Sequence, residues 1–438
     1  LDLVIATRDL AKPRQSRKMV SALNSGFRLK AGMTDNLSQN MKIITDKNKI
    51  EKLLTRGVEE VLVKENLRKR LESGKKLRIK LGIDPTGSVL HLGHAVVLRK
   101  LKDFQDLGHQ VIFLIGDFTA KIGDPTGRSQ TRKPLTDKEI KNNMKSYAKQ
   151  AGLILDMDRV EIRYNSEWID KLNFQKLIIL ASKITYAQMA QRADFKERIK
   201  NDQDLSLQEF LYPMMQGYDS VALKADVELG GTDQKFNLLM GRQLQKRYNQ
   251  EPQDIVTCPL LEGLSGGDKM SKSLYNYIAL TEKPEQMYGK IMSLTDNLIV
   301  RYFSLGANLP EQEVAKIKSD LAGGGINPRD YKMKLAYEVV KIYHGEKKAK
   351  AAEEHFVKTV QKKEAPSDVQ VTHSPAPSIS IIDYLIEAGL AASKSDARRK
   401  IEQGGVYVDE KRVESIDLIL NSESDHGKVI KVGKRNFR

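Results

Sequence analysis

Residues 77–115 constrain the fold more than any other stretch, because they place a strand pattern on each side of one helical pattern. In "LRIKLGID" apolar residues alternate with period two, as they do in a strand. "GHAVVLRKLKDFQDLG" has its apolar residues on one helical face and ends at Gly108. The next segment, "QVIFLIGD", is a continuous apolar run typical of a strand covered on both faces. Strand, helix and strand joined by short loops predict a βαβ unit and therefore a parallel sheet.

A second alternation of this kind follows at "ADVELGGTDQKFNLLMGRQLQ" and "DIVTCPLL". In an open parallel sheet the ligand lies beyond the carboxyl ends of the strands. We therefore expect "DPTGSVLHLGH" and "GGTDQ" to open onto one crevice.

Composition narrows the class of protein. The 438 residues predict two or three domains. The net charge of +16 favours a polyanion such as nucleic acid as partner, although a lysine-rich solvated surface gives the same balance. No apolar run approaches the ~20 residues of a membrane span, so no membrane association is expected. The single cysteine, Cys258, excludes a disulfide framework and a multi-cysteine zinc site, and fits a reducing, cytoplasmic setting.

Two stretches interrupt the folded pattern. Residues 1–40 begin without methionine and show no sustained periodicity, so we expect a leader outside the fold. The segment "QKKEAPSDVQVTHSPAPS", at 361–378, is rich in proline and polar residues and predicts an extended linker. Residues 379–438 should then form a separate small domain.

The pair His91 and His94 lies where a loop enters a helix. Free backbone N–H groups and the positive end of the helix dipole favour an anion there. Imidazoles donate hydrogen bonds to phosphate oxygens, and Gly93 lets a ligand approach the backbone. Taken alone, one histidine capping the helix and one exposed is the commoner arrangement. Zinc is a poor alternative, because no third ligand is evident.

The loop "GGDKMSKS", residues 266–273, carries two lysines and two hydroxyls between flexible glycines. Such a loop suits closure over a triphosphate, although a lysine loop by itself is more often solvated surface. The candidate groups are Lys269, Ser271, Lys272 and Ser273. Together with the histidine pair they favour a phosphate site.

"HLGH" and "KMSKS" resemble the paired signatures of class I aminoacyl-tRNA synthetases. Five further stretches narrow the resemblance to the bacterial-type tyrosyl-tRNA synthetases: "GIDPTGSVLHLGH", "GDFTAKIGDPTGRS", "YPMMQGYDS", "ELGGTDQKFN" and "AGLAASKSDARRKIEQGGVYVDEKRV". The resemblance runs from about Met41 to the end of the chain. Many members carry a tyrosine four residues before the aspartate of "DPT"; this chain has Lys80 there and resembles a second subgroup that carries lysine.

The resemblance implies an α/β fold with three parts. These are a Rossmann-like parallel-sheet catalytic domain, an α-helical domain and a small α+β RNA-binding domain. The implied segments are a leader (1–40), a helical segment (41–75), the catalytic domain with a dimer-interface insertion (76–262), the KMSKS loop with the helical anticodon-side domain (263–360), the linker (361–378) and the RNA-binding domain (379–438).

The resemblance also assigns residues to ATP. Groups that act on the phosphates would be His91, His94, Thr86, Lys269, Lys272, Arg128 and Arg132. Groups that line the nucleotide pocket would be Gly82, Asp84, Gly93, Gly231, Asp233, Met270 and Lys272, with Asp233 on the ribose. Each has a plainer reading: Asp84 before Pro85 could merely start a turn.

A third set is assigned to tyrosine. Residues expected at the amino acid are Lys80, Asp124, Tyr212, Gln216, Asp219 and Gln234, with Asp219 accepting the phenolic hydroxyl. Tyr212, Gln216 and Asp219 share one helical face by their spacing, which is equally compatible with a solvated face.

The implied reaction joins tyrosine to ATP and then to tRNA. The tyrosine carboxylate attacks the α-phosphate, pyrophosphate leaves, and a terminal ribose hydroxyl of tRNA takes the tyrosyl group. Mg²⁺ should accompany ATP, and no protein-bound metal is expected. Tyrosine, ATP and tRNA are the expected ligands, and a cytoplasmic homodimer is the expected form.

The C-terminal segment predicts two helices, "SIIDYLIEAGL" and "SKSDARRKIEQGG", and a hairpin at "VYVDEKRV". The second helix should begin at Ser393 or Ser395 and stop at the Gly404-Gly405 pair. Its basic residues, expected to contact tRNA phosphates, are Lys394, Arg398, Arg399 and Lys400. The segment resembles a small RNA-binding domain first known from a ribosomal protein; a solvated helical hairpin is the alternative.

Three rival functions remain open at this stage. A nucleotidylyltransferase shares the HxGH turn but has no reason to carry the lysine loop and a basic tail. A tryptophanyl enzyme is the nearest relative, against which "YxxxQxxD" with "GGTDQ" favours tyrosine. A noncatalytic RNA-binding or splicing factor would have an eroded site, whereas both signatures are intact.

Overall fold

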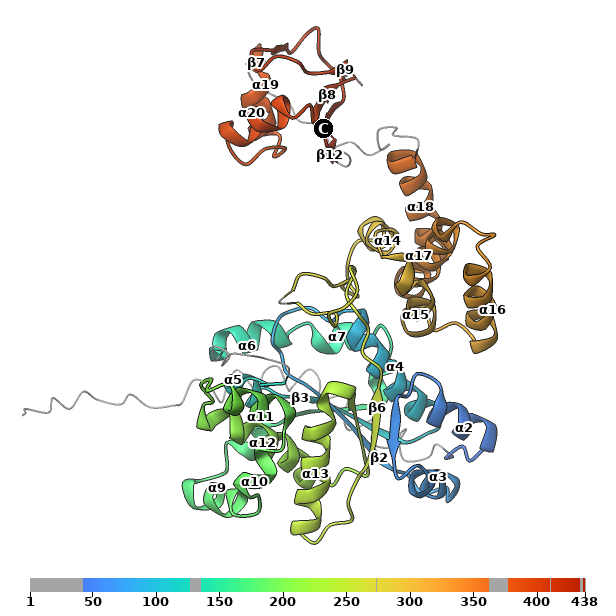
Figure 1. The fold of residues 1–438 in the computed structure, drawn as a ribbon, viewed down its shortest axis with the longest axis vertical. Coiled ribbons are helices and arrows are strands. Elements are labelled where there is room, and N and C mark those ends of the chain that lie inside the picture. Colours follow the sequence, from blue (N-terminus) through green and yellow to red (C-terminus); the bar gives the residue numbers. More distant parts are fainter. Residues whose placement is uncertain are drawn as a thin grey trace, which may run out of the picture. The chain divides into compact units, whose positions relative to one another are not determined.

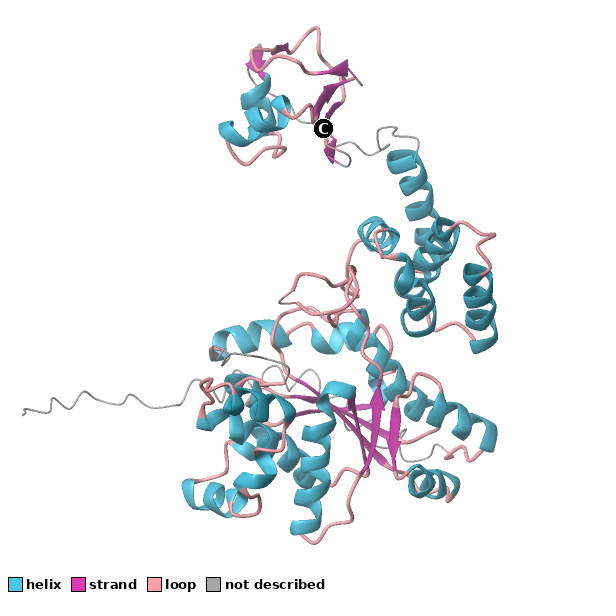
Figure 2. Cartoon of the chain, in the orientation of Figure 1, coloured by secondary structure: helices cyan, strands magenta, loops and turns pink. Residues whose placement is uncertain are grey.

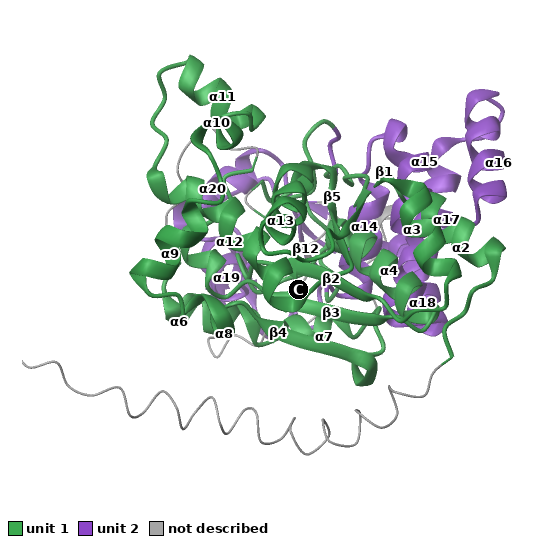
Figure 3. Cartoon of the chain, turned by 90° about the horizontal axis from the view of Figure 1, so that it is seen from below, with its two compact units in different colours: residues 1–263, 267–281 green, residues 264–266, 282–438 purple. Residues whose placement is uncertain are grey.

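The computed structural model describes residues 42–126, 135–272, 274–361, 377–409, 411–433 and 436–437. The chain divides into two compact units, residues 1–263 with 267–281 and residues 264–266 with 282–438 (Figure 3). The lysines of the KMSKS loop thus belong to the first unit, although we had grouped them with the helices that follow. Each unit is described by itself.

The first unit contains a six-stranded sheet of order β1-β6-β5-β2-β3-β4 (Figure 1). Every neighbouring pair is parallel except β1 and β6, which confirms the predicted parallel sheet. The strands are β1 (Glu60–Leu62), β2 (Arg78–Ile83), β3 (Gln110–Ile115), β4 (Val160–Tyr164), β5 (Val227–Gly231) and β6 (Asp254–Cys258). Because strand order reverses between β2 and β5, the carboxyl ends of these two strands flank the topological switch point.

Helices cover both faces of this sheet. Helix α4 connects β2 to β3 and α13 connects β5 to β6, so right-handed crossovers place them on opposite faces. The helices are α2 (Lys47–Thr55), α3 (Lys64–Glu72), α4 (Leu92–Asp106), α5 (Thr119–Ile122), α6 (Asp137–Met144), α7 (Tyr147–Ala151), α8 (Ser166–Ile169), α9 (Phe174–Ala181), α10 (Tyr186–Met189), α11 (Ala193–Lys200), α12 (Leu207–Leu223) and α13 (Lys235–Arg247). Figure 2 shows the helices arranged around the sheet.

Strand β2 is more buried than its alternating pattern indicated. Ile79 and Leu81 are buried as expected, but Lys80 between them is buried as well. The strand lies at the centre of the sheet, and Lys80 points toward α12, where it contacts Gln216 and Ser220. The charged side chain therefore needs partners inside the fold.

The segment 41–75 contains a strand that the helical expectation did not include. Between α2 and α3, β1 joins the sheet as its antiparallel edge, with Val61 opposite Val256. Helix α2 begins after Asp46, whose carboxylate accepts the Lys49 backbone N–H at 2.8 Å.

The second unit begins with helices and ends with a small α+β fold. Its helices are α14 (Pro284–Met292), α15 (Ile299–Arg301), α16 (Glu311–Ala322), α17 (Pro328–His344), α18 (Glu346–Phe356), α19 (Ile381–Glu387) and α20 (Lys394–Glu402). Its strands are β7 (Ser378–Ser380), β8 (Val406–Val408), β9 (Lys411–Arg412), β10 (Ile419–Asn421), β11 (Ile430–Val432) and β12 (Asn436–Phe437). Residues 381–432 share a separate apolar core that includes Ile381, Leu385 and Ile401.

The predicted C-terminal helices and hairpin are confirmed. Helix α20 begins after Ser393, whose hydroxyl accepts the Asp396 N–H at 3.2 Å. Gly404 takes a φ of +69°, which ends the helix. Strands β8 and β9 pair antiparallel. The sequence did not predict that β7 pairs with the distant β10, or that β11 extends the hairpin.

Candidate active site

The two signature motifs meet at the amino end of α4. The segment after the lysine loop runs along the turn before α4: Leu92 N–H donates to the Ile278 carbonyl at 3.0 Å and Leu280 N–H to that of Leu90 at 2.9 Å. A side chain at Gly93 would lie 3.1 Å from the His91 ring and 3.7 Å from Met270 Cβ. Residues of "HLGH" and "KMSKS" are therefore neighbours within the first unit.

The rings of His91 and His94 lie against each other, tilted by 49°, with their centroids 3.8 Å apart. His94 Nδ1 accepts the His91 backbone N–H at 3.1 Å, so part of the motif caps the helix. Burial and the nearby Lys272 charge lower the pKa of His91 to about 3. Burial, His91 and Lys272 likewise hold the pKa of His94 well below its usual value. Both imidazoles are thus neutral near pH 7 and offer hydrogen bonds rather than charge.

The two lysines of the loop have different partners. The Lys269 ammonium lies 2.5 Å from the Asp233 carboxylate. Lys272 donates to the Gly87 carbonyl at 3.3 Å and to the Tyr147 hydroxyl at 3.0 Å. Ser273, Arg128 and Arg132 lie outside the described residues.

Asp84 follows β2 and is held from two elements. Its Oδ1 accepts the Thr119 hydroxyl at 2.7 Å and its Oδ2 accepts the Tyr212 hydroxyl at 2.9 Å. A side chain at Gly116 would come within 2.0 Å of Asp84 Oδ1, so only glycine fits beneath the carboxylate. Burial, and then the Asp84 charge, raise the pKa of Tyr212 well above its usual range, which keeps it a hydrogen-bond donor.

Asp219, on α12, is almost completely buried. Its Oδ1 accepts the Trp168 Nε1–H at 2.8 Å and its Oδ2 accepts the Asn165 amide at 3.3 Å. Burial raises the pKa of Asp219 to about 7, while Lys80 and the two donors act in the opposite direction. The carboxyl can accept one more hydrogen bond from a polar group of a ligand.

Asp124 and Gln234 meet although 110 positions separate them. Gln234 Nε2 donates to Asp124 Oδ2 at 2.8 Å. Thr126 donates to Asp124 Oδ1 through its backbone N–H at 3.0 Å and its hydroxyl at 2.6 Å. An acceptor-rich carboxylate of this kind suits an ammonium group.

Lys80 and Gln216, both expected at the tyrosine, are joined to each other by a hydrogen bond. The Lys80 ammonium donates to the Gln216 carbonyl at 3.2 Å and to the Ser220 hydroxyl at 2.9 Å, and lies 2.8 Å from Glu228. The ammonium is fully buried, and its partners lie on α12 and β5.

The remaining expected positions line the strand ends. Gly82 is exposed in β2. Thr86 N–H donates to the Asp84 carbonyl at 2.8 Å. Gly231 ends β5, and a side chain there would come within 2.7 Å of Asp233 Oδ1.

Sequence reasoning missed several residues that build this site. Trp168, Asn165 and Arg192 come from the segment between β4 and α12, and Tyr147 comes from α7. None belongs to a motif recognisable by spacing. Only their polar or aromatic character inside a largely apolar region was available as a signal.

The basic residues of α20 are exposed or half-buried. Lys394 pairs with Asp383 at 2.9 Å, and Arg399 and Lys400 pair with Asp396 at 2.5 and 2.7 Å. Arg398 is exposed. Such surface pairs are weak, so the lysine and arginine heads remain open to exchange onto phosphates.

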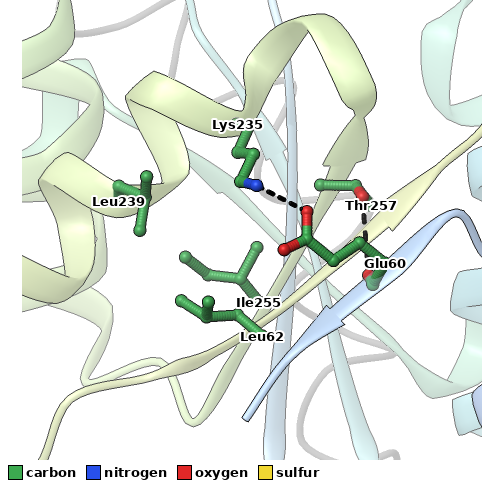
Figure 4. Close-up of a pocket in the computed structure, with 6 residues that line it drawn as sticks. All are labelled: Glu60, Leu62, Lys235, Leu239, Ile255 and Thr257. Atoms are coloured by element: carbon green, nitrogen blue, oxygen red, sulfur yellow. Dashed lines mark hydrogen bonds and ion pairs between the residues drawn. The ribbon is translucent and has the colours of Figure 1, made fainter. Parts of the chain in front are cut away.

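A shallow pocket lies elsewhere in the first unit, between β1, β6 and α13 (Figure 4). Lys235 points across it to Glu60, with 2.6 Å between ammonium and carboxylate. Leu62, Leu239, Ile255 and Thr257 complete its lining. None of the expected ligand residues contributes to it.

Metal-binding clusters and membrane-spanning helices are both absent from the described residues. In the part of the chain that the structure describes, no three His, Cys, Asp or Glu side chains gather as a metal site. No helix within the described ranges combines the length and apolarity that crossing a membrane requires.

Comparison with known proteins gives concordant matches. Residues 71–361 match the family model of class I tRNA synthetases for tryptophan and tyrosine (W and Y), and residues 361–438 match the SYY-like C-terminal domain of tyrosine-tRNA ligase. The tyrosine-tRNA ligase of Thermotoga maritima is 51% identical over 386 residues, covering 88% of this chain and 96% of the relative. That of Francisella tularensis is 49% identical over 385 residues, again covering 88% and 96%.

Solved structures share the fold. A C-terminally truncated mitochondrial tyrosyl-tRNA synthetase of Aspergillus nidulans superimposes with a TM-score of 0.59 at 24% identity, covering 76% of this chain and 98% of that one. A tyrosyl-tRNA synthetase of Archaeoglobus fulgidus, complexed with L-tyrosine, gives a TM-score of 0.58 at 24% identity over 70% of this chain and all of that one.

Proposed function

The chain belongs to the class I tyrosyl-tRNA synthetases, and from this premise we propose that the crevice at the ends of β2 and β5 is where it binds tyrosine and ATP. The enzyme is a tyrosine-tRNA ligase, which activates tyrosine with ATP and transfers it to tRNA. The curated relatives at about half identity favour tyrosine over tryptophan. The observation that carries the site assignment is the convergence of Asp84, Asp124 and Asp219, whose donors Tyr212, Gln234 and Trp168 come from α12, η2 (Thr232–Gln234) and α8.

Tyrosine would lie along α12. Asp219 accepts the phenolic hydroxyl, because its carboxyl is buried and already oriented by Trp168 and Asn165. Asp124, with Gln234 and Tyr212, holds the α-amino end. An enzyme whose buried acceptor needs a substrate hydroxyl rejects an analogue without one; tyrosyl-tRNA synthetase is itself the established example of this rule.

ATP would lie over the amino end of α4. His91 and His94 donate hydrogen bonds from neutral rings, and the helix end adds a positive dipole. For Lys269 to reach the phosphates it must leave Asp233, which would then be released to bind the ribose. Lys272 must likewise leave Gly87 and Tyr147, so loop movement is part of the cycle.

The chemistry requires positioning and charge stabilisation rather than a covalent enzyme intermediate. The tyrosine carboxylate attacks the α-phosphorus as the bond to pyrophosphate breaks, and a terminal ribose hydroxyl of tRNA then displaces AMP. Lysine ammonium groups stabilise the charge that spreads over the phosphate oxygens. Mg²⁺ would arrive with ATP as part of the substrate, held mainly by its phosphates.

A homodimer would use the segment between β4 and α12. Among the described residues, large apolar side chains at least a third exposed recur there and at the first residue of α12: Phe174, Ile178, Ile179, Tyr186, Ile199 and Leu207. Phe174 alone is 78% exposed. Exposed apolar surface of this density marks an interaction site. If Phe174→Glu and Ile178→Glu leave the sedimentation behaviour of the wild type unchanged, this face is not the interface.

The C-terminal fold would bind tRNA through α20. The single cysteine, Cys258, has a buried thiol, which suits a cytoplasmic location.

The decisive test of the whole assignment is ATP-pyrophosphate exchange with each amino acid in turn. Exchange should depend on tyrosine and be poor with phenylalanine and tryptophan. Equal exchange with tryptophan would overturn the assignment of the pocket.

A further inference from the structure

We propose that Arg192 is a positioning residue that fixes Asp124 and Gln234 for the α-amino group of tyrosine. The inference rests on the proposed role of Asp124 at that group. It assigns a function to a side chain outside every recognised motif, at the N-cap of α11.

The side chains around Arg192 form a closed ring of hydrogen bonds. Arg192 donates to the side-chain oxygen Oδ1 of Asn237 at 3.2 Å and to the Thr126 hydroxyl at 2.6 Å. Asn237 donates to Gln234 Oε1 at 3.0 Å, and Gln234 donates to Asp124 Oδ2 at 2.8 Å. The Thr126 hydroxyl closes the ring on Asp124 Oδ1 at 2.6 Å.

The ring fixes which way the amide of Gln234 points. Because Asn237 occupies its oxygen, the Gln234 NH₂ group must face Asp124. The carboxylate then has two donors on Oδ1, both from Thr126, and one on Oδ2. Its side chain keeps 22% exposure. Oδ2 therefore retains a lone pair for an incoming ammonium group.

Arg192 is itself held from all sides. Its side chain is only 4% exposed, and Nε donates to Asp194 at 2.7 Å. The guanidinium lies over the rings of Phe195 and Phe236, with 4.8 and 5.8 Å to the centroids. Asp194 and Asp124 balance its charge, the latter at 3.6 Å. A planar fork with three differently directed N–H groups is required here, and lysine lacks it.

A role of Arg192 through its charge and a role through its geometry predict opposite effects on tyrosine binding. If Arg192 acted only by its charge, it would oppose the ammonium of tyrosine, and its removal would strengthen binding. If it acts by geometry, Arg192→Lys keeps the charge, loses the fork, and weakens binding. We expect the second result, with about tenfold weaker tyrosine binding, the scale of a hydrogen bond to a charged group.

The experiment compares tyrosine with one analogue that lacks the carboxylate, tyramine, and one that lacks the amine, 3-(4-hydroxyphenyl)propionate. Binding of tyrosine, tyramine and 3-(4-hydroxyphenyl)propionate is measured by calorimetry on the full-length wild type, Arg192→Lys and Thr126→Val. Thr126→Val breaks the ring at another point, in case the arginine variant folds poorly. Arg198→Lys is the matched control, because Arg198 is an equally buried arginine that pairs with Glu209 in the same segment and lies outside the ring.

The expected result is selective. Arg192→Lys and Thr126→Val should weaken tyrosine and tyramine by about tenfold and leave the propionate, which lacks the amine, within about twofold. A general loss of packing would weaken all three ligands alike and would overturn the proposal, as would an unchanged tyrosine affinity.

Asp124→Asn separates the inference from its premise. If that variant loses the preference for amine-bearing ligands while Arg192→Lys keeps it, the inference fails and the role of Asp124 stands. If Asp124→Asn keeps the preference, the proposed role of Asp124 fails and the inference falls with it.

Discussion

The Lys80 ammonium lies 2.8 Å from the Glu228 carboxylate, and neither side chain is more than 1% exposed. The pair joins β2 to β5 beneath α12, where Ser220 accepts from Lys80 and donates to Glu228 at 2.9 Å in each case. Gln253 adds a further donor to Glu228. Lys80 therefore supports the helix that carries Asp219.

Breaking this pair should cost more stability than replacing it. Lys80→Met leaves Glu228 buried and unpaired, so we expect a loss of about 3–5 kcal/mol in the free energy of unfolding. In Lys80→Met/Glu228→Gln the charge is gone and the amide oxygen still accepts from Ser220, so most of that loss should be recovered. Urea denaturation at pH 7.5 measures both, and equal stability of the two variants would contradict this account.

The raised pKa of Asp219, about 7, predicts a pH effect on stability. Below the ordinary value of 3.8 the carboxyl is protonated in both folded and unfolded states. Between 3.8 and about 7 the folded state holds a proton that the unfolded state has lost. The contribution of this group to stability therefore falls as pH rises through that window. Thermal denaturation of Asp219→Asn should lack this component.

The same titration should affect specificity. The carboxylate form accepts the phenolic hydroxyl, and a group of pKa about 7 is about 10% ionised at pH 6 and about 90% at pH 8. Preference for tyrosine over phenylalanine in pyrophosphate exchange should thus rise up to about ninefold between these values. The neighbouring Lys80 charge lowers the pKa of Asp219 and the Glu228 charge raises it. A flat wild-type profile, or the same rise in Asp219→Asn, would remove Asp219 from this role.

The phosphate groups should act on rate rather than on tyrosine affinity. Lys269→Ala, Lys272→Ala and His91→Ala should each slow tyrosyl-adenylate formation about 100-fold or more, the cost of removing a preorganised charge-stabilising donor. Tyrosine binding should change little. Because the pKa of His91 is about 3, no His91 titration should appear in the rate between pH 5 and 8. Single-turnover kinetics test both points; a purely structural role would lower thermal stability and spare the rate of the folded fraction.

The sequence predicted the parts of this fold that depend on local pattern. The unit β2-α4-β3 follows from the hydrophobic period, and the neighbouring carboxyl ends of the parallel strands β2 and β5 agree with the switch-point rule. The strand β1 was hidden, because three residues at a sheet edge carry little periodicity.

The residues that hold the site side chains in place could not be predicted from local sequence patterns, for a different reason. Trp168 reaches Asp219 across 51 positions and Arg192 reaches Thr126 across 66. Such contacts depend on the path of the segment between β4 and α12, and no local pattern specifies that path. Lys80 was singled out by its position, but its burial became evident only once α12 was placed over β2.

Removing the C-terminal fold should separate activation from transfer. A chain ending near Val371 keeps the whole crevice of the first unit, and the lost part has an apolar core of its own, so tyrosine-dependent pyrophosphate exchange should persist. Charging of tRNA should be poor, because the shortened chain lacks the basic residues Lys394, Arg398, Arg399 and Lys400, which would pair with phosphates. The salt dependence of tRNA affinity should become shallower for the same reason.

Pyrophosphate exchange and tRNA tyrosylation are measured on the shortened and full-length chains at two salt concentrations. A full-length Arg398→Ala/Arg399→Ala variant is the control, because it keeps the fold and removes only charge. Undiminished tyrosylation by the shortened chain would show that the C-terminal fold does not bind tRNA, whereas loss of exchange would show that the catalytic unit needs it.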